Sequence, residues 1–363
     1  MKAAVCNAYG KPLDIEEVTL EPPKENEVRV RVVAAAICHS DIHSIKGEHQ
    51  LAKLPALPGH EVAGVVDYVG DEVTYVKPGD PVVCCLVRSG CGHCYSCIMG
   101  KPNLCENWQY EFSRPGPYLN QKGERMSLFS GSFAGFAEYT NVYEDALVKI
   151  PDDMPMDRAC LLACGVISGF GAVDNRAQVR PFSSVMVVGT GGVGLNAVQG
   201  AAFVGAHPII AADILDSKLE AARAFGATHT INMQREKDPL PAVLKMTHGR
   251  GVDYAFMAVA GIESKRQAFS MLSRNGMSVL IGHGMKEFLS DFNVIEFVGG
   301  KIMTGCAMGA SRIRVDIPNL IELYQAGRLK LDELVSEKYS LDQINEAVAS
   351  AERGEVLRNV ILF

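Results

Sequence analysis

Residues 183–201 read "SSVMVVGTGGVGLNAVQGA", and this stretch decides the class of fold. An apolar run of strand length ends in glycines spaced as G-x-G-x-x-G, and helix-forming residues follow. The glycines are Gly189, Gly191 and Gly194, with Gly192 and Val193 between the last two. They allow a tight turn and close approach of a diphosphate, which the N-terminus of the helix attracts. The stretch therefore predicts a strand–turn–helix unit that binds a dinucleotide.

An acidic residue ends the next predicted strand. Asp213 follows the apolar run "PIIAA" and lies roughly 20 residues beyond Gly194, where the dinucleotide fingerprint has its carboxylate. A carboxylate there accepts the ribose hydroxyls of NAD and repels the additional phosphate of NADP. The alternative is a helix cap or turn residue, but the surrounding fingerprint favours NAD binding.

The pattern changes on either side of this unit. From about Ser168 to Ala307 strands and helices alternate, which is typical of a parallel sheet with helices on both faces. From Met1 to about Leu147 short alternating strands are separated by Gly and Pro, which predicts a β-rich domain. Helical stretches and a last strand at 358–363 follow, and periodicity does not assign them to either domain. At 363 residues, two domains are expected.

Composition excludes several classes of function. The net charge of −7 gives no basic patch for nucleic acid or for a membrane surface. The first residues, "MKAAVCNAYGKPLDIEEV", contain no apolar run long enough for a signal peptide or membrane span. We therefore expect a cytoplasmic protein, in which the 11 cysteines are metal ligands or buried thiols rather than disulfides.

Four of these cysteines lie in one short segment, "CGHCYSCIMGKPNLC". They are Cys91, Cys94, Cys97 and Cys105. Four thiolates suit a tetrahedral zinc ion whose coordination is closed to substrate, so the segment predicts a structural site. An iron–sulfur centre is the alternative, although ferredoxins place Pro after the last cysteine and here Glu106 follows.

A second set of candidate ligands is dispersed along the chain. Cys38 lies in "AICHSDIHSIKG", His60 in "LPGHEVAG" and Cys164 in "LLACGVISGFGA". Two sulfurs and one imidazole leave one position of a zinc ion open for a reactant. Taken singly, a lone cysteine is usually a buried apolar residue, and a lone histidine after Pro-Gly is usually a loop residue. Spacing alone does not bring the three together.

The motifs together resemble one family. "CHSDIHSIKG", "GHEVAGVV", the four-cysteine segment, "GTGGVG" and "GRLKLDELV" look like the zinc-containing medium-chain dehydrogenase/reductase family, on its alcohol dehydrogenase branch. The resemblance runs along the whole chain. It implies an α/β fold with a GroES-like β-rich catalytic domain at 1–165 and 308–363, carrying a structural zinc lobe at about 88–108. A Rossmann NAD-binding domain with a doubly wound parallel sheet is implied at 166–307.

The resemblance also implies roles for particular residues. Cys38, His60 and Cys164 would hold a catalytic zinc, and the four-cysteine segment would hold a structural one, giving two zinc ions per chain. Asp41 matches the carboxylate that orients the zinc-bound histidine, and Glu61 matches a glutamate just outside the ligands.

Proton transfer and cofactor binding involve further matches. Ser40 and His43 match a relay that carries the substrate proton to solvent. His39 and Arg358 match contacts to the pyrophosphate, and Lys218 matches a lysine near the ribose. From the residues alone, Ser40 could equally cap a helix, His43 could be a surface histidine, and Lys218 could lie on a solvated helix face.

The activity implied is reversible hydride transfer between a primary or secondary alcohol and NAD, giving an aldehyde or ketone. Most relatives form dimers or tetramers, so the resemblance implies a homodimer or homotetramer whose partner is a small-molecule alcohol or aldehyde. The alternatives are an aldehyde or ketone reductase, a thiol-adduct dehydrogenase of the S-hydroxymethyl glutathione type, and a catalytically inactive nucleotide-binding protein. A zinc-free quinone-reductase-like enzyme is disfavoured because that branch lacks both ligand sets.

One segment bears on the choice of substrate. The C-terminal third looks closest to the glutathione-linked, class III-like branch and its bacterial relatives. That class has an arginine four residues after the last structural cysteine, where this chain has Gln109, which cannot pair bidentately with a carboxylate. We therefore expect a plain alcohol, bulky or aromatic, with Trp108, Tyr110 and Phe112 either lining its pocket or packing beneath a loop.

Overall fold

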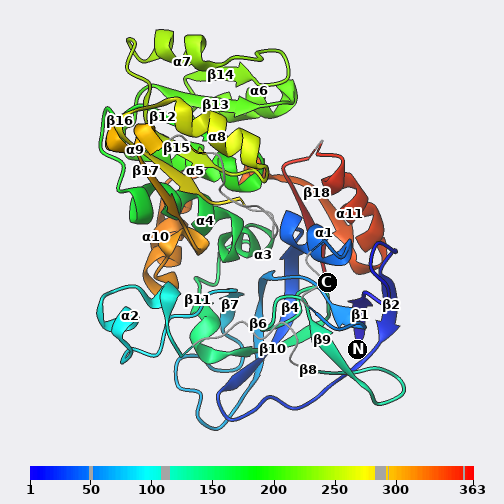
Figure 1. Cartoon of the computed structure of the whole chain (residues 1–363). Helices are drawn as coiled ribbons and strands as arrows, with labels where there is room; N and C mark the ends of the chain where they lie inside the picture. Colours follow the sequence, from blue (N-terminus) through cyan, green and yellow to red (C-terminus); the bar gives the residue numbers. More distant parts are fainter. Residues whose placement is uncertain (49–51, 108–114, 283–291, 293, 355) are drawn as a thin grey trace. The chain divides into compact units, whose positions relative to one another are not determined.

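The computed structural model describes residues 1–48, 52–107, 115–282, 292, 294–354 and 356–363. The chain divides into two compact units, which Figure 1 shows coloured along the sequence. The first comprises Met1–Cys164, Arg312–Gly327 and Leu331–Phe363, and the second comprises Gly165–Ser311 and Arg328–Lys330. Most of the C-terminal tail, which periodicity left unassigned, therefore lies in the first unit.

A seven-stranded sheet forms the centre of the first unit. Its order is β11-β7-β6-β4-β19-β18, and β10 also pairs with β4. The strands are β4 (Glu27–Ala36), β6 (Glu61–Val69), β7 (Pro81–Cys84), β10 (Tyr139–Tyr143), β11 (Leu147–Lys149), β18 (Val335–Ser340) and β19 (Arg358–Leu362). β19 pairs antiparallel with the end of β4, with Val360 opposite Ala36. The last strand of the chain thus completes the sheet that carries the N-terminal motifs.

Smaller elements surround this sheet. The other strands are β1 (Lys2–Val5) and β2 (Asp14–Glu17), which pair, and β3 (Thr19–Leu20), β5 (Ala56–Leu57), β8 (Pro115–Leu119) and β9 (Arg125–Leu128), which form a four-stranded sheet. The α-helices are α1 (His39–Ile45), α2 (Tyr95–Ile98), α3 (Met156–Ala159), α10 (Ile313–Gln325) and α11 (Ile344–Glu352). The core of the unit includes the fully buried rings of Phe133 and Phe136, packed with β-branched residues of the sheet, as alternating strands require.

The second unit is built on a six-stranded parallel sheet in the order β14-β13-β12-β15-β16-β17. The strands are β12 (Val185–Val188), β13 (Ile209–Asp213), β14 (His229–Asn232), β15 (Val252–Met257), β16 (Leu272–Leu280) and β17 (Ile302–Gly305). The α-helices are α4 (Gly165–Gly171), α5 (Gly192–Phe203), α6 (Asp216–Ala224), α7 (Leu240–Met246), α8 (Ile262–Ser270) and α9 (Val294–Val298). The predicted combination of a β-rich domain and a parallel α/β sheet is confirmed.

Close packing in the second unit depends on a glycine in α4. A Cβ at Gly169 would meet the carbonyl oxygen of Val193 at 2.1 Å and the amide nitrogen of Ala197 at 2.8 Å. Those distances are far shorter than real Cβ contacts, so only glycine allows α4 to approach α5 this closely. The packing fixes the helix that follows the glycine turn.

In the described part of the chain, no single helix combines the length and apolar character needed to cross a bilayer. Among the described helices, one bent pair, Met156–Ala163 with Gly165–Ala177, reaches both criteria when taken together.

Candidate metal centres and nucleotide loop

Four side chains of the first unit converge in its interior. The candidate ligand atoms of Cys38, His60, Glu61 and Cys164 all lie within 4.8 Å of one another, and all four residues are buried. Cys38 is the N-cap of α1, His60 and Glu61 stand at the start of β6, and Cys164 follows a short 3-10 helix. The fold therefore brings together the three candidate ligands that spacing alone did not, and adds a carboxylate.

Asp41 is hydrogen-bonded to two of these candidate ligands. Its Oδ1 accepts hydrogen bonds from the Gly59 amide at 3.1 Å and from Nδ1 of His60 at 2.9 Å. Its Oδ2 accepts one from the Cys38 amide at 3.1 Å. A bond to Nδ1 leaves Nε2 of His60 as the nitrogen that can bind a metal ion. Asp41 therefore lies where its carboxylate can orient the imidazole of His60.

The electrostatics of the cluster favour a bound cation. The hydrogen bond from Cys164 holds the pKa of Cys38 well below its usual value, and His60 and Arg358 add to the effect against burial. The pKa of Cys164 is raised, first by its bond to Cys38 and then by burial. Burial would lower the pKa of His60, but Asp41 and Cys38 raise it well above its usual value. A thiolate is thus already favoured at the position where a cation would bind.

Glu61 is paired with an arginine from the other end of the chain. Nη2 of Arg358 lies 2.5 Å from Oε1 of Glu61, and Nη1 donates to the carbonyl of Ile37 at 3.1 Å. Both side chains are almost completely buried, with exposed fractions of 5% and 0%. Burial raises the pKa of Glu61 to about 7, while Arg358 opposes the rise. The structure thus places Arg358, which the resemblance assigned to a pyrophosphate, against Glu61.

The remaining predicted residues of this region lie on α1. Oγ of Ser40 is 3.6 Å from Sγ of Cys38, and the ring of His39 lies 6.4 Å from that of His43. Nδ1 of His43 lies 2.5 Å from Oε2 of Glu48. His39 and Ser40 are exposed and His43 is partly exposed, so all three are accessible next to the buried cluster.

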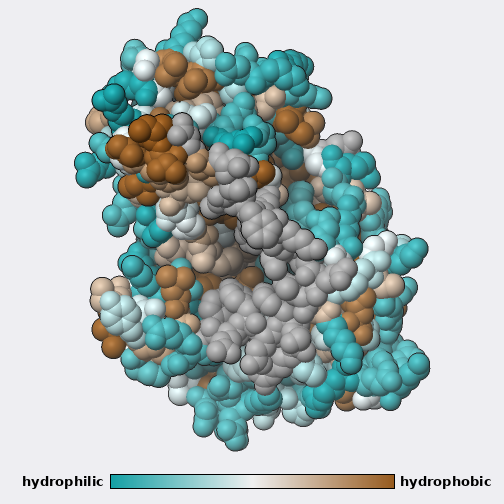
Figure 2. Space-filling view, viewed as in Figure 1, coloured by the Kyte–Doolittle hydropathy of each residue, from teal (hydrophilic) through white to brown (hydrophobic). Residues whose placement is uncertain are grey.

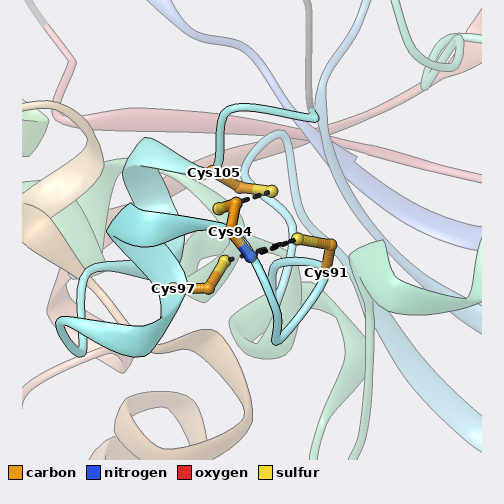
Figure 3. Close-up of side chains that lie close together, drawn as sticks. All are labelled: Cys91, Cys94, Cys97 and Cys105. Carbon is orange, nitrogen blue, oxygen red and sulfur yellow. Dashed lines mark hydrogen bonds between the residues drawn. The ribbon is translucent and has the colours of Figure 1, made fainter.

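The four-cysteine segment forms a second cluster. Figure 3 shows the side chains of Cys91, Cys94, Cys97 and Cys105 directed toward one another from α2 and the loops beside it. Sγ of Cys91 is 4.0 Å from Sγ of Cys97, and Sγ of Cys94 is 4.0 Å from Sγ of Cys105. Zinc–sulfur bonds of about 2.3 Å in a tetrahedron place sulfurs about 3.8 Å apart, so the cluster matches one tetrahedral ion.

Backbone amides favour a thiolate at Cys91 and Cys94, whereas burial raises the pKa of Cys97 to about 12. The amide of His93 lowers the pKa of Cys91 to about 6, and the amide of Glu106 lowers that of Cys94. All 11 cysteines are free, so neither cluster is a disulfide. The donor sets fit two zinc-type sites, one closed by four cysteines and one formed by cysteine, histidine and glutamate.

The glycine turn in the second unit adopts the shape that a diphosphate requires. Gly189 has a positive φ of +86°, and a Cβ at Gly194 would meet the Gly189 carbonyl oxygen at 1.7 Å. Nothing lies within 4 Å of a Cβ built at Gly191, at the N-cap of α5. The turn is therefore packed on its inner side and open at the helix N-terminus, which fits a dinucleotide.

Asp213 ends β13 beside this turn. Its Oδ2 accepts from the amide and hydroxyl of Thr190 at 2.7 and 3.1 Å, and its Oδ1 from the amides of Ile214 and Leu215 at 2.7 and 3.1 Å. The carboxylate is thus fixed at the edge of the glycine turn, where an adenosine ribose would lie. Lys218 is partly exposed on α6, the next helix.

Sequence reasoning missed three contacting residues: Thr190, Glu48 and Glu106. Thr190 occupies a variable position of the glycine motif, and the other two lie in loops without periodic pattern, so no sequence signal identified them. Trp108, Gln109, Tyr110 and Phe112, on which the choice of substrate depended, lie outside the described residues.

Comparisons with known proteins give matches to two domain families and to solved structures over the full chain. Residues 24–152 match the alcohol dehydrogenase GroES-like domain, and residues 192–326 match the zinc-binding dehydrogenase domain. An alcohol dehydrogenase zinc-binding domain protein from Burkholderia ambifaria has 34% identity and a TM-score of 0.93, over 100% of this chain and 98% of its own. Benzyl alcohol dehydrogenase from Acinetobacter calcoaceticus has 32% identity and a TM-score of 0.91, and the match covers 100% of this chain and 99% of the Acinetobacter chain. An alcohol dehydrogenase from Thermus sp. ATN1 has 27% identity and a TM-score of 0.84, and the match covers 100% of this chain and 99% of the Thermus chain.

Proposed function

The chain belongs to the zinc-dependent alcohol dehydrogenase family of oxidoreductases, and from that premise we propose that it transfers hydride reversibly between an alcohol and NAD. The observation that carries the proposal is the convergence of Cys38, His60 and Cys164 beside a hydroxyl and an imidazole on α1. When bound, zinc supplies Lewis acidity toward the alcohol oxygen and NAD supplies the hydride acceptor.

Residues of the chain itself would bind the metal, orient its histidine ligand and transfer the proton. Cys38, Cys164 and Nε2 of His60 would bind the zinc, with the imidazole oriented by Asp41. Oγ of Ser40 would accept the hydroxyl proton of the substrate while its own proton passes to the ribose hydroxyl of the cofactor, and His43 would take a proton from that hydroxyl and release one to solvent. This order follows from position, because Oγ of Ser40 lies 3.6 Å from Sγ of the candidate ligand Cys38.

Two cofactor-binding contacts support the choice of NAD. The open N-terminus of α5 at Gly191 would receive the pyrophosphate, and Asp213 would accept hydrogen bonds from the ribose hydroxyls. A 2′-phosphate at that position would stand against the Asp213 carboxylate, and like charges so close cost free energy. His39 and Lys218 are proposed as supporting contacts to the pyrophosphate and the ribose.

For the substrate we propose a primary or secondary alcohol with an aromatic or bulky group. The support is the likeness over the full chain to an enzyme named for benzyl alcohol. Gln109, in place of the arginine of the glutathione-linked class, argues against a carboxylate-bearing thiol adduct. We propose the cytoplasm as the location, because cysteines used as metal ligands or buried thiols are typical of a reducing compartment.

The test combines metal analysis with a substrate panel. We expect two zinc ions per chain and NAD reduction that is faster with benzylic alcohols than with hydroxymethyl thiol adducts. Cys164→Ser should abolish turnover but leave NADH binding within about twofold, because Cys164 acts only through the metal. Cys6→Ser is the matched control, since Cys6 is buried outside both clusters and donates to the Ala8 carbonyl, as serine can. Full activity in Cys164→Ser, or a clear preference for thiol adducts, contradicts the proposal.

We further propose that a second copy of the chain docks on one edge of the second unit. Figure 2 shows an apolar patch over α9 and β17, and the exposed fractions are 74% for Val294, 76% for Val298 and 46% for Ile302. β17 is an edge strand of the parallel sheet, and such an edge with apolar neighbours is suited to pairing across a two-fold axis. Val298→Glu should lower the mass measured by light scattering, whereas Val315→Glu, at a valine 49% exposed on α10, should not. An unchanged mass in Val298→Glu contradicts this interface.

A further inference from the structure

The four-cysteine lobe has almost no apolar core of its own. None of the residues of α2 is buried, and Tyr95 and Ile98 are 73% and 72% exposed. Within residues 91–105 only Asn103 and Cys105 are buried. Burial of apolar surface therefore contributes little to the shape of the lobe, which must depend on polar bonds and on the bound ion.

Glu106 connects the two ends of the lobe. Its Oε1 accepts hydrogen bonds from the amide of Ser96 at 3.1 Å and from the hydroxyl of Ser96 at 2.9 Å. Its own amide donates to Sγ of Cys94. Glu106 directly follows Cys105, so it ties the chain after the last ligand to both the sulfur of Cys94 and the first turn of α2.

Asn107 makes a second connection on the other side of Cys94. Its Nδ2 lies 3.1 Å from Nε2 of His93, and Nδ1 of His93 lies 2.8 Å from the carbonyl oxygen of Cys91. A carbonyl only accepts, so Nδ1 of His93 carries the hydrogen and Nε2 accepts from Asn107. One tautomer of His93 therefore satisfies both hydrogen bonds, which connect Asn107 through His93 to Cys91.

We propose that Glu106 and Asn107 are positioning residues that lock Cys94 against Cys105 and so set the rate at which the lobe releases its metal. The two side chains bind His93 and Ser96, which stand on either side of Cys94 in the sequence. An ion can leave only when its ligands separate, and these bonds oppose the separation of Cys94 from Cys105. The inference rests on the assignment of this lobe as a metal site.

Metal release from the whole, metal-loaded protein tests the proposal. An excess of a chromophoric zinc chelator should give two phases, and the phase that parallels loss of activity belongs to the catalytic centre. We expect Glu106→Ala to accelerate the other phase about tenfold, as loss of a residue that orients metal ligands typically does. Glu106→Gln should accelerate it less, because its amide oxygen can still accept from Ser96. The double variant Glu106→Ala with Asn107→Ala should release this metal faster than either single variant.

Hydrogen–deuterium exchange of residues 91–107 gives a readout that is independent of activity. Exchange there should rise in Glu106→Ala while the catalytic phase of release stays unchanged. Glu124→Ala is the matched control, because its exposed carboxylate accepts from Asn120 in a different hairpin. Release and exchange at the wild-type rates in the single and double variants overturn the proposal. Wild-type protein with one zinc ion or none instead overturns the metal assignment on which the proposal rests.

Discussion

Nδ1 of His60 lies 2.9 Å from Oδ1 of Asp41, and both side chains are buried. The same carboxylate accepts hydrogen bonds from the amides of Cys38 and Gly59, so one acidic side chain connects the start of α1 with the start of β6, which carry two candidate ligands. Asp41 therefore fixes both the tautomer of the imidazole and the separation of the two ligands.

Asp41→Asn should weaken zinc binding at the catalytic centre by about 10- to 100-fold. Asparagine has the same size, but its single oxygen cannot accept all three bonds and its amide group would face another donor. Competition with a chelator of known affinity measures the change. Asp14→Asn, at an exposed aspartate bonded to Asn7, should have no effect. Equal affinities for the wild type and Asp41→Asn would show that the carboxylate does not position the ligands.

Zinc affinity of the catalytic centre should increase with pH. In metal-free protein the pKa of His60 is raised, so the protonated imidazole beside Asp41 stabilises the fold below its unfolded pKa. That contribution disappears as the pH rises through the raised value. Zinc needs the neutral imidazole and must displace this proton, so affinity should change about tenfold per pH unit for each proton displaced. Chelator competition between pH 6 and 8 measures it, and a flat profile would contradict the pKa shift.

Breaking the buried pair of Glu61 and Arg358 should be costly. Arg358→Met leaves the Glu61 carboxylate without its cation in a dry interior, which should lower the free energy of unfolding by about 3–5 kcal/mol. The double variant with Glu61→Gln should recover part of this loss, because no uncompensated charge remains. Urea denaturation measures both. Lys46→Met, which breaks an exposed pair with Glu352, should cost less than about 1 kcal/mol. Similar losses for the buried and exposed pairs would contradict the argument.

The sequence predicted those parts of the fold and sites that depend on local pattern. The parallel sheet and the glycine turn follow from apolar periodicity and from the positive φ that Gly189 must adopt, and the four cysteines lie within one short segment of the sequence. Cys38, His60 and Cys164 are distant in sequence, so only resemblance to a family grouped them. The pairing of Arg358 with Glu61 depends on β19 lying beside β4, which no local pattern indicates.

Cofactor preference should depend on the charge of Asp213. Asp213→Asn keeps an oxygen that can accept from Thr190 but removes the charge that would oppose a 2′-phosphate. Unit charges 4 Å apart repel by about 4 kcal/mol at an effective dielectric constant of 20, so the ratio of NADPH to NADH affinities should rise at least about tenfold. Fluorescence titration measures both affinities without turnover. Thr190→Val, which removes only one donor to Asp213, is the control. An unchanged ratio in Asp213→Asn would remove this residue from cofactor selection.

The contact between His43 and Glu48 gives a test of proton transfer. Nδ1 of His43 lies 2.5 Å from the Glu48 carboxylate, which holds the hydrogen on Nδ1 and makes Nε2 the nitrogen that can accept a proton. General acid–base groups contribute about 10²- to 10⁴-fold, so partial misorientation of His43 in Glu48→Ala should lower kcat for alcohol oxidation about tenfold in dilute buffer. Concentrated imidazole buffer should restore the rate, because an external base can replace a misplaced one. Glu352→Ala, at the exposed carboxylate bound to Lys46 beside the same helix, should behave as wild type. A loss in Glu48→Ala that buffer does not restore would mean that Glu48 supports the loop and not the transfer of the proton.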